Sequence, residues 1–322
     1  MKFNRLFVAS ISLLLSSVCS SAVAGIINLG AAANYNAFIH QNFSATSSDV
    51  EGRLAAGGDV SISNYSVNIK NGTQLYADTS GSPALLVGGD LSFSSGQVAG
   101  NVSVTGNYTP TGTGSITNGT LNTGGISAID FDIEFAHLID VSTDLALLTA
   151  NSSASDLWSS QYLVGAGLNS LANDVHVFSL DASDMLFTDY LLSDVDNGDT
   201  VVFNVSGTDI STSWGNFGGS DSSLVNISEN ILFNFYEAES LNINAALYGS
   251  ILAPKASIQA PHGVIWGQVI AKSWQGNTQI NDNPFAGNSP NRAVTVPVPE
   301  PSTLVIMIIG VIGLVAGRYS QQ

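Results

Sequence analysis

The stretch Gly57-Gly58-Asp59-Val60-Ser61 decides the expected fold, because variants of it recur along the chain. A second copy, Gly88-Gly89-Asp90-Leu91-Ser92, follows 31 residues later, and shorter copies follow at Gly100-Asn101-Val102-Ser103 and Gly106-Asn107-Tyr108-Thr109. Glycine with Asp or Asn favours a tight turn, and alternating apolar and hydroxyl residues favour a short strand with one buried face. Short strands that recur at such turns predict the rungs of a β-solenoid.

A similar pattern returns later in the chain. Residues Gly249–Pro254 (GSILAP) recur 18 residues later as Gly267–Lys272 (GQVIAK). Eighteen residues are enough for three short strands and three turns, so we expect one coil of the solenoid between the two copies. The alternative is a pair of ordinary sandwich strands that share a turn type.

The pattern changes between the two repeat blocks. Residues Ser127–Ala150 carry apolar residues near 3.6-residue spacing, and acidic residues crowd the first turns, where they favour a helix N-terminus. Residues Asp174–Leu192 and Thr200–Val205 alternate as strands, and the turn Asp196–Asp199 predicts a hairpin between them. The expected fold is mainly β, a β-solenoid or β-helix-like domain with one flanking α-helix that covers it.

The N-terminal residues have the layout of a secretory signal peptide. Met1–Arg5 carries two basic residues, Leu6–Val18 is apolar, and Ala22-Val23-Ala24 precedes Gly25. This order predicts cleavage after Ala24, so residues 1–24 are expected to be removed on export. Cys19, the only cysteine, lacks the preceding residues of a lipoprotein signal, so we expect a processed chain without cysteine, disulfide or Cys-based site.

The C-terminal residues read as a sorting signal. Pro299, Glu300, Pro301, Ser302 and Thr303 precede an apolar run, 304–317, which Arg318 closes. Fourteen helical residues span about 21 Å at 1.5 Å each, short of a hydrocarbon core of roughly 30 Å. We therefore expect a marginal transmembrane helix with Arg318 at the cytoplasmic end. The alternative, a buried helix of a globular domain, would usually show a polar face.

These signals divide the chain into a signal peptide (1–24), one β domain (25–285), a linker (286–298) and a sorting tail (299–322). Between the two signals stand 24 acidic and 5 basic residues, a net charge of −19. Such a surface has no basic patch for nucleic acid or anionic lipid, and it keeps an exported protein soluble. The 44% hydrophobic content is too high for a disordered chain.

No catalytic motif is recognisable in the sequence. There is no Gly-x-Ser-x-Gly elbow, no His-Glu-x-x-His motif and no phosphate loop. The four histidines are scattered and are interpreted as surface or cap residues: His40, His137, His176 and His262. The chain is therefore expected not to be an enzyme. A β-helical carbohydrate-active enzyme is the alternative, although basic residues to neutralise a substrate carboxylate are few.

Two acidic segments are candidate ligand sites. Asp194–Asp199 resembles the start of a calcium loop, but Val205 stands where an EF-hand requires Glu, so a surface turn is favoured and no cofactor is expected. Asp49 and Glu51 beside Arg53 predict a structural ion pair. Among the aromatic residues, Trp266 and Trp274, with Tyr248, are candidates for a sugar-stacking strip that also includes Trp158 and Trp214. Core packing is the alternative.

The tail, with Pro299-Glu300-Pro301 before an apolar helix and a terminal basic residue, resembles the PEP-CTERM signal of Gram-negative bacteria. That resemblance implies export across the inner membrane, anchoring through the C-terminus, and processing by an exosortase, a membrane protease. Several blocks between Leu29 and Phe285 resemble the choice-of-anchor A domain, a surface domain joined to varied C-terminal anchors. They are Leu29-Gly30-Ala31-Ala32, Tyr35-Asn36, Asp49-Val50-Glu51-Gly52-Arg53, Val201–Gly207, Leu232–Ala238, Gly249–Pro254, Gly267–Lys272 and Asn283-Pro284-Phe285.

Some members of that family are described as adhesin-like. Together, the residues and the two resemblances predict a secreted, non-enzymatic protein of the cell envelope or matrix. Its expected role is adhesion, or biofilm structure through exopolysaccharide or a surface protein ligand.

Overall fold

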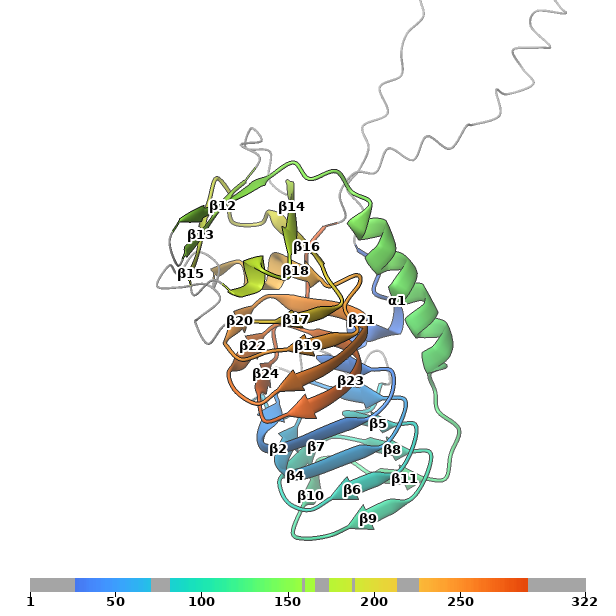
Figure 1. The fold of residues 1–322 in the computed structure, drawn as a ribbon. Coiled ribbons are helices and arrows are strands. Elements are labelled where there is room, and N and C mark those ends of the chain that lie inside the picture. Colours follow the sequence, from blue (N-terminus) through green and yellow to red (C-terminus); the bar gives the residue numbers. More distant parts are fainter. Residues whose placement is uncertain are drawn as a thin grey trace, which may run out of the picture. The chain divides into compact units, whose positions relative to one another are not determined.

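The computed structural model describes residues 27–70, 82–157, 160–165, 174–186, 189–212 and 226–288. The prediction of a mainly β, solenoid-like fold with one helix is confirmed: short parallel strands stack coil on coil beside a single α-helix (Figure 1). Each coil contributes strands to three faces, which we call the first, second and third face. The predicted signal peptide, the linker beyond residue 288 and the sorting tail lie outside the described residues.

The first face holds one strand of every coil, and neighbouring strands are parallel. In spatial order it contains β14 (Val175–Asp181), β16 (Thr200–Ser206), β18 (Ile231–Asn234), the start of β21 (Ser250–Ala260), the start of β23 (Val269–Gly276), β1 (Ala37–Ile39), β3 (Leu54–Ala56), β5 (Leu85–Val87), β8 (Val102–Val104) and β11 (Leu121–Thr123).

The second face contains β17 (Asp209–Ser211), β19 (Ser240–Asn242), the ends of β21 and β23, the start of β2 (Phe43–Val50), the start of β4 (Val60–Val67), β6 (Leu91–Phe93) and β9 (Tyr108–Pro110). The third face contains β20 (Leu247–Tyr248), β22 (Val264–Trp266), β24 (Gln279–Asn281), the ends of β2 and β4, β7 (Gln97–Ala99) and β10 (Ser115–Thr117).

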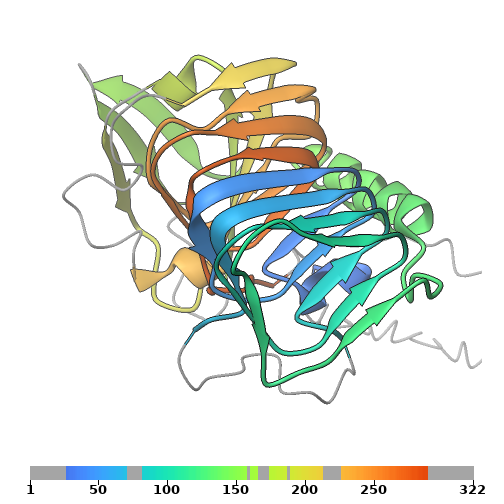
Figure 2. The ribbon, with the colours of Figure 1, turned by 90° about the horizontal axis from the view of Figure 1, so that it is seen from below.

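The order of coils in space differs from their order in the chain. The chain starts in the middle of the stack at β1, proceeds coil by coil to β11, returns through the helix, and re-enters the stack at β14. The last coil, β23, then pairs with β1, with Ala37 in register with Val269 (Figure 2). The two repeat blocks of the sequence are therefore halves of one solenoid.

Coil lengths follow the repeat spacings seen in the sequence. Ile251 is in register with Val269, which confirms the predicted 18-residue coil. Leu54 is in register with Leu85, 31 residues on, and Leu85 with Val102, only 17 residues on. The longer coil contains residues 71–81, which lie outside the described residues. The first repeat interval is thus one ordinary coil with an insertion.

The interior of the solenoid is filled by every second residue of each strand, as expected for strands with one buried side. Aromatic side chains in register stack along the axis. The ring centroids of Phe178 and Phe203 lie 5.0 Å apart, and those of Phe203 and Phe233 lie 4.8 Å apart. Because adjacent coils repeat at strand spacing, one side-chain type placed at the same coil position packs continuously on itself.

Helix α1 (Phe131–Ala146) lies along the outside of the first face (Figure 1). The predicted helix is confirmed with shorter bounds, and Asp130 caps it by accepting a hydrogen bond from the Ile133 backbone N–H at 3.2 Å. Many outward residues of the first face are apolar and pack under α1 and the short helix η1 (Gly30–Asn34). They include Phe38, Ala55, Leu86, Val202, Leu232, Leu252 and Ile270.

Buried polar groups fix the position of α1 on the stack. The side-chain amide of Asn234 donates to the Asn204 Oδ1 atom and to the Ser142 backbone carbonyl, both at 2.8 Å. The Ser142 hydroxyl donates back to Asn234 Oδ1, and the Asn204 amide donates to the Leu145 carbonyl at 2.7 Å. Since every one of these groups is buried, the helix can satisfy them in only one register.

The predicted hairpin at Asp196–Asp199 is wrong. Its incoming strand, β15 (Asp189–Ser193), belongs to a separate three-stranded sheet with β12 (Ser153–Leu157) and β13 (Ser160–Val164). Strands β14 and β16 instead pair in parallel. Turn residues specify a change of direction, but they do not specify which strands pair.

Two short helices complete the fold, η3 (Asp184–Leu186) and η4 (Ser228–Asn230). Among the described helices, none has the length and hydrophobicity needed to cross a membrane.

Candidate ligand-binding face

A ladder of uncharged polar side chains runs along the second face. Its members are in register from one strand to the next, and each is exposed or partly exposed. We call this set the polar ladder: Ser211, Asn242, Gln259, Gln275, Ser44, Ser61, Ser92 and Thr109. Neighbouring members repeat at the strand spacing of about 4.8 Å.

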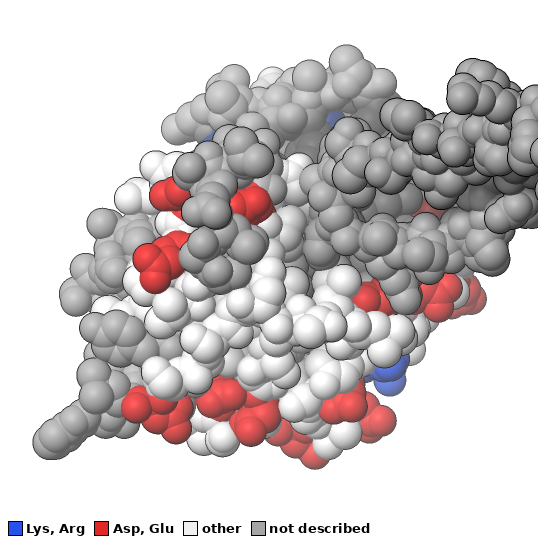
Figure 3. All heavy atoms as spheres, turned by 90° about the horizontal axis from the view of Figure 1, so that it is seen from above, with Lys and Arg blue, Asp and Glu red and all other residues white. Residues whose placement is uncertain are grey.

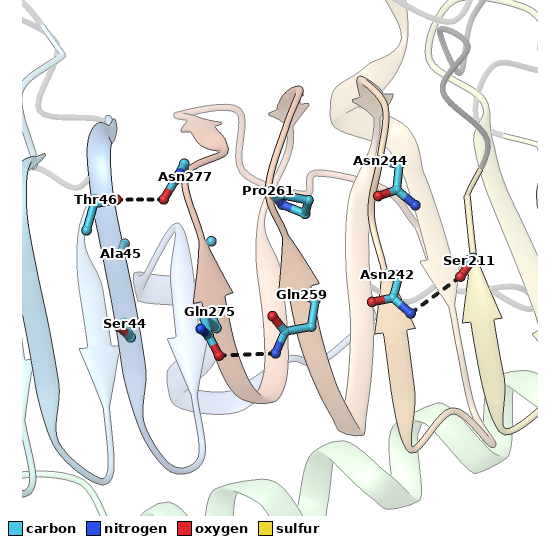
Figure 4. Close-up of a pocket in the computed structure, with 11 residues that line it drawn as sticks. Ser44, Ala45, Thr46, Ser211, Asn242, Asn244, Gln259, Pro261, Gln275 and Asn277 are labelled. Carbon is cyan, nitrogen blue, oxygen red and sulfur yellow. Dashed lines mark hydrogen bonds between the residues drawn. The ribbon is translucent and has the colours of Figure 1, made fainter.

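The upper half of the polar ladder borders a shallow hollow with a volume of about 490 Å³ (Figure 4). Ala45, Gly276 and Pro261 supply small or apolar parts of its lining, while hydroxyl and amide groups supply the rest. No residue that lines the hollow is charged. The remaining lining residues are Ser44, Thr46, Ser211, Asn242, Asn244, Gln259, Gln275 and Asn277.

Hydrogen bonds between the side chains around the hollow are mostly long. The Gln259 amide donates to Gln275 Oε1 at 3.3 Å, and the Asn242 amide donates to Ser211 Oγ at 3.4 Å (Figure 4). The Thr46 hydroxyl and the Asn277 amide group form a shorter bond of 2.7 Å. Bonds above 3.2 Å are weak, so these amides can exchange them for bonds to a ligand at little cost.

At the corner that leads into the second face, a different set of side chains links each coil to the next. Asn42 Oδ1 accepts a hydrogen bond from the Asp59 backbone N–H at 2.9 Å, and Asp59 Oδ1 accepts one from Asp90 N–H at 2.8 Å. Asp90 Oδ1 accepts in turn from Asn107 N–H at 2.7 Å. We call Asn42, Asp59, Asp90 and Asn107 the corner ladder. The last three are the Asp or Asn of the repeated unit, and Asn42 is its counterpart one coil earlier. Each side chain thus takes up a backbone donor of the next coil.

Of the three aromatic residues predicted to contact a ligand, two lie together at the surface. Tyr248 and Trp266 are in register on β20 and β22, and their ring centroids lie 6.2 Å apart with an angle of 17° between the planes. Trp266 is 40% exposed and Tyr248 is half-buried. This stacked pair belongs to the third face, so it is separate from the polar ladder.

Trp274 does not belong to this pair, which corrects the predicted strip. Its side chain points into the solenoid, is only 2% exposed and stacks on Phe43 with a centroid distance of 6.1 Å. Trp274 lies on the second face, between the outward residues Ser273 and Gln275, and its place in the alternation makes it a core residue. Trp158 and Trp214 lie outside the described residues, as do the sorting residues Pro299 to Thr303 and Arg318 and the cleavage residues Ala22, Ala24 and Gly25.

One predicted surface histidine is buried. His176 is 1% exposed, and its Nε2 atom lies 3.0 Å from Asp199 Oδ2. Asp199 also accepts hydrogen bonds from the backbone N–H groups of Asp174 and Asp196, so its carboxylate organises the turn that was considered as a calcium loop. Across the described residues, no group of three or more His, Cys, Asp or Glu side chains could hold a metal ion.

The other three histidines are partly or fully exposed. His40 Nε2 lies 2.8 Å from Asp132 Oδ1, and its ring stacks on Phe135. His137 Nε2 lies 3.0 Å from the Asn28 carbonyl, and His262 stands at an exposed turn. None of the three lines the hollow.

The acidic segment Asp49–Glu51 contributes to a partly buried electrostatic cluster. Glu51 pairs with Lys70 at 3.9 Å, and its carboxylate accepts a hydrogen bond from the Asp282 backbone N–H at 2.9 Å. Arg53 is 5% exposed. Burial raises the pKa of the Asp282 carboxyl to about 6, and the nearby charges of Lys70 and Arg53 act against that rise. Glu51 therefore contacts Lys70 and the Asp282 backbone, which the sequence did not connect, and the predicted ion pair with Arg53 stays a prediction.

The sequence contains one signal for the polar ladder. Ser44, Ser61, Ser92 and Thr109 follow the same 17- and 31-residue spacings as the repeated unit. The members from the C-terminal block, Gln259 and Gln275, carry no such signal, because the pairing of that block with the first one is decided by β1 and β23.

A parallel solenoid with a continuous row of uncharged polar side chains offers a long, regular surface for binding. The chain belongs to the family described as the putative ice-binding-like adhesive domain, whose model matches residues 28–282. A second family model, the PEP-CTERM protein-sorting motif, matches residues 297–319. The resemblance to the choice-of-anchor A domain is a resemblance to a related family, and that name is not the one matched.

Two solved structures are similar to the chain. One is an ice-binding protein from the Antarctic ascomycete Antarctomyces psychrotrophicus, with 15% identity, a TM-score of 0.35, and coverage of 81% of this chain and 98% of that one. The other is an ice-binding protein from an Antarctic biological consortium, with 13% identity, a TM-score of 0.36, and coverage of 81% and 92%. No curated protein matches the chain.

The PEP-CTERM motif implies export, membrane-associated sorting to the cell surface and processing by an exosortase. Together with the adhesive domain, it makes this chain an exported surface protein.

Proposed function

We propose that this protein is a non-enzymatic adhesive protein that binds extracellular polysaccharide through its second face. The observation that carries the proposal is the polar ladder, eight uncharged hydroxyl and amide side chains in register along one face. A polymer lying along the stack meets an equivalent donor or acceptor at each coil. Many weak contacts along one rigid surface then add up to useful affinity.

The chemistry of the hollow favours a neutral polysaccharide. Sugar hydroxyls both donate and accept hydrogen bonds, and so do the Ser, Thr, Asn and Gln side chains that line the hollow. The full chain carries a net charge of −17, so an anionic polymer would be repelled by the surrounding surface. Asp and Glu side chains are scattered over the end of the molecule seen from above, where basic side chains are few (Figure 3).

The Tyr248–Trp266 pair is proposed as a second sugar contact. A large aromatic ring that is 40% exposed offers an apolar platform for the face of a sugar ring. Because the pair lies on the third face, one glycan chain on the polar ladder and another on the aromatic pair could be held at once. This arrangement suits a role in a biofilm or an exopolysaccharide matrix.

The family description also names ice binding, and two features of the second face favour adhesion to a glycan instead. The face is hollowed rather than flat, and its ladder mixes side chains of different lengths, from Ser44 to Gln275. A regular crystal surface requires a regular array of equal groups, whereas a flexible glycan adapts to an uneven one.

The sorting signal indicates where in the cell this function is carried out. We propose that the protein crosses the inner membrane, is held there transiently by the helix at 304–317, and is cut by the exosortase before it reaches the envelope or the medium. No cofactor is needed for binding of this kind, and none is proposed.

The rival hypothesis, a secreted β-helical carbohydrate-active enzyme, requires catalytic carboxylates in a glycan-binding cleft, and the lining of the hollow contains none.

The test is a pull-down of the full protein on polysaccharide from its own host, combined with an assay for new reducing ends. Binding without new ends is expected, and released oligosaccharide would overturn the proposal. Gln259→Ala with Gln275→Ala should weaken binding at least several-fold, and Trp266→Ala should weaken it independently. The control is Gln97→Ala, which alters an exposed glutamine on the third face. If the double variant binds as the control does, the second face is not the site.

A further inference from the structure

The lower end of the solenoid is an open edge on all three faces. Strands β9, β10 and β11 form the last coil, and each pairs with one strand only, β6, β7 and β8 respectively (Figures 1 and 2). Within the described residues, no strand pairs with the outer edge of this coil. Unpaired backbone groups on such an edge are a template for another strand.

The other end of the stack differs. Helix η3 lies against β14 and β17, and β12 of the three-stranded sheet lies against β14. The last described residue, Asn288, donates its backbone N–H to Thr200 Oγ1 at the start of β16, at 2.7 Å. The last described residue therefore lies near the covered end of the stack and not at the open end.

The composition of the open end is unusual for an exposed sheet edge. Residues 91–129 contain no charged residue, although the full chain has a net charge of −17. Natural proteins usually protect such an edge with charges or proline, and here only Pro110 on β9 serves that purpose. Strands β10 and β11 have no such protection.

Apolar side chains accompany the unpaired edge. Tyr108, Ile116 and Leu121 pack on the core but remain only partly buried, because no further coil covers them. Ile126, just beyond β11, is 97% exposed. The corner ladder also ends here. Asn107 is its last member, and no backbone N–H group of a further coil follows it among the described residues.

We propose that the open end is the contact surface for a second copy of this protein, which joins end to end through antiparallel pairing of the last coils. A strand edge is complementary to itself, and a twofold contact uses the same surface on both partners. The net charge argues for this surface in particular. Two molecules that each carry strong negative charge repel each other least where both surfaces are uncharged.

The contact gives adhesion a second route that does not depend on the proposed polysaccharide site. The end-to-end contact would join two copies of the protein directly.

Cross-linking of the full, processed protein on intact cells tests the proposal. The only cysteine, Cys19, lies in the predicted signal peptide, so an introduced cysteine is the single one of the processed chain. Three separate variants each carry one cysteine at an exposed edge residue: Thr109→Cys, Ser115→Cys and Asn122→Cys. A short bis-maleimide cross-linker is then added. A twofold axis brings one of the three edges next to its own copy, so at least one variant should give a dimer.

The matched control is Ser61→Cys, which is equally exposed but lies on an inner coil. Adding a charge at the edge, Ser115→Lys or Asn122→Lys, to the cross-linking variant should abolish the dimer while leaving the melting temperature unchanged. The proposal is overturned if no edge cysteine exceeds the control, if the product contains a different protein, or if the added lysine has no effect. The Gln259→Ala and Gln275→Ala variant should still cross-link, which separates this contact from the polysaccharide site.

Discussion

The Asp59 Oδ1 atom lies so close to Gly89 that a Cβ atom on that residue would clash with it, and it accepts the Asp90 backbone N–H at 2.8 Å. The same relationship joins Asn42 to Gly58 and Asp90 to Gly106. The glycine of the repeated unit is therefore required because the carboxylate or amide of the preceding coil fills its side-chain space. The Gly-Asp pair links one coil to the next, and its recurrence builds the stack.

Replacing Gly89 by alanine should destabilise the domain for this steric reason. Either Asp59 moves away and leaves a backbone donor without its partner, or the coils separate locally. We expect the free energy of unfolding to fall by about 1–3 kcal/mol in thermal or denaturant unfolding. Gly125→Ala is the control, because no heavy atom lies within 4 Å of a Cβ atom placed there. The variant Asp59→Ala with Gly89→Ala should lose less than the sum of the single losses, and strict additivity would contradict the explanation.

Asn234→Ala should loosen helix α1 from the solenoid. The substitution removes the amide that joins Asn204 to the Ser142 carbonyl, and it leaves buried groups without partners. We expect a loss of about 1–3 kcal/mol in the free energy of unfolding, together with faster hydrogen exchange in Phe131–Ala146. Asn242→Ala is the comparison, since that side chain is half-buried and its bond to Ser211 is 3.4 Å long. Equal losses in both variants would argue against a special role for the buried group.

Stability should rise as the pH falls from about 6 toward 4, in part because of Asp282. Burial raises its pKa from 3.8 to about 6, and the charges of Glu51, Lys70 and Arg53 modify that rise. Between these two values the folded protein binds a proton that the unfolded chain does not, so the free energy of unfolding decreases as pH increases. Above pH 6 the full cost of the buried charge is present.

Thermal unfolding at a series of pH values measures this effect. Asp282→Asn should flatten the slope between pH 4 and 6, whereas Asp196→Asn, at an exposed turn, should leave it unchanged. Asp49 has a raised pKa of the same origin and adds to the slope that remains. An unaltered slope in Asp282→Asn would show that this carboxyl does not cause the dependence.

Changing Pro299, Glu300 and Pro301 to alanine should block processing of the tail. The matched motif at 297–319 contains these residues, and the apolar run that follows them would still hold the precursor in the inner membrane. Immunoblots of membrane fractions and an intact mass of the released protein measure the outcome. Pro290→Ala, before the motif, should be processed normally. Normal processing of the triple variant would refute the assignment of the motif.

Much of the fold could be predicted from the sequence because its information is local. The Gly-Asp unit at Gly58 and Gly89, the 18-residue spacing of the C-terminal block and the apolar period of the helix each depend on residues close in the chain. The pairing of β14 with β16 could not be predicted in this way, because a turn at Asp196–Asp199 fits a hairpin and a solenoid corner equally well.

The candidate site was likewise predictable from the sequence only in part. Trp266 and Trp274 looked equivalent in the sequence, yet one lies at the surface beside Tyr248 and the other is buried against Phe43. A strand alternates its side chains with a period of two, and a one-residue change of register exchanges the inside for the outside. The phase of that alternation is decided by packing with neighbouring coils.

The sequence by itself determined that this is an exported, acidic chain of repeated turns and short strands, because composition and repeat spacing are properties of the chain alone. Only the tertiary structure decided that the two repeat blocks form one solenoid through β1 and β23, which places Gln275 beside Ser44 in a single polar ladder. The physical reason is that strand pairing between distant segments depends on which edges remain open once local coils have formed. No local pattern encodes that choice.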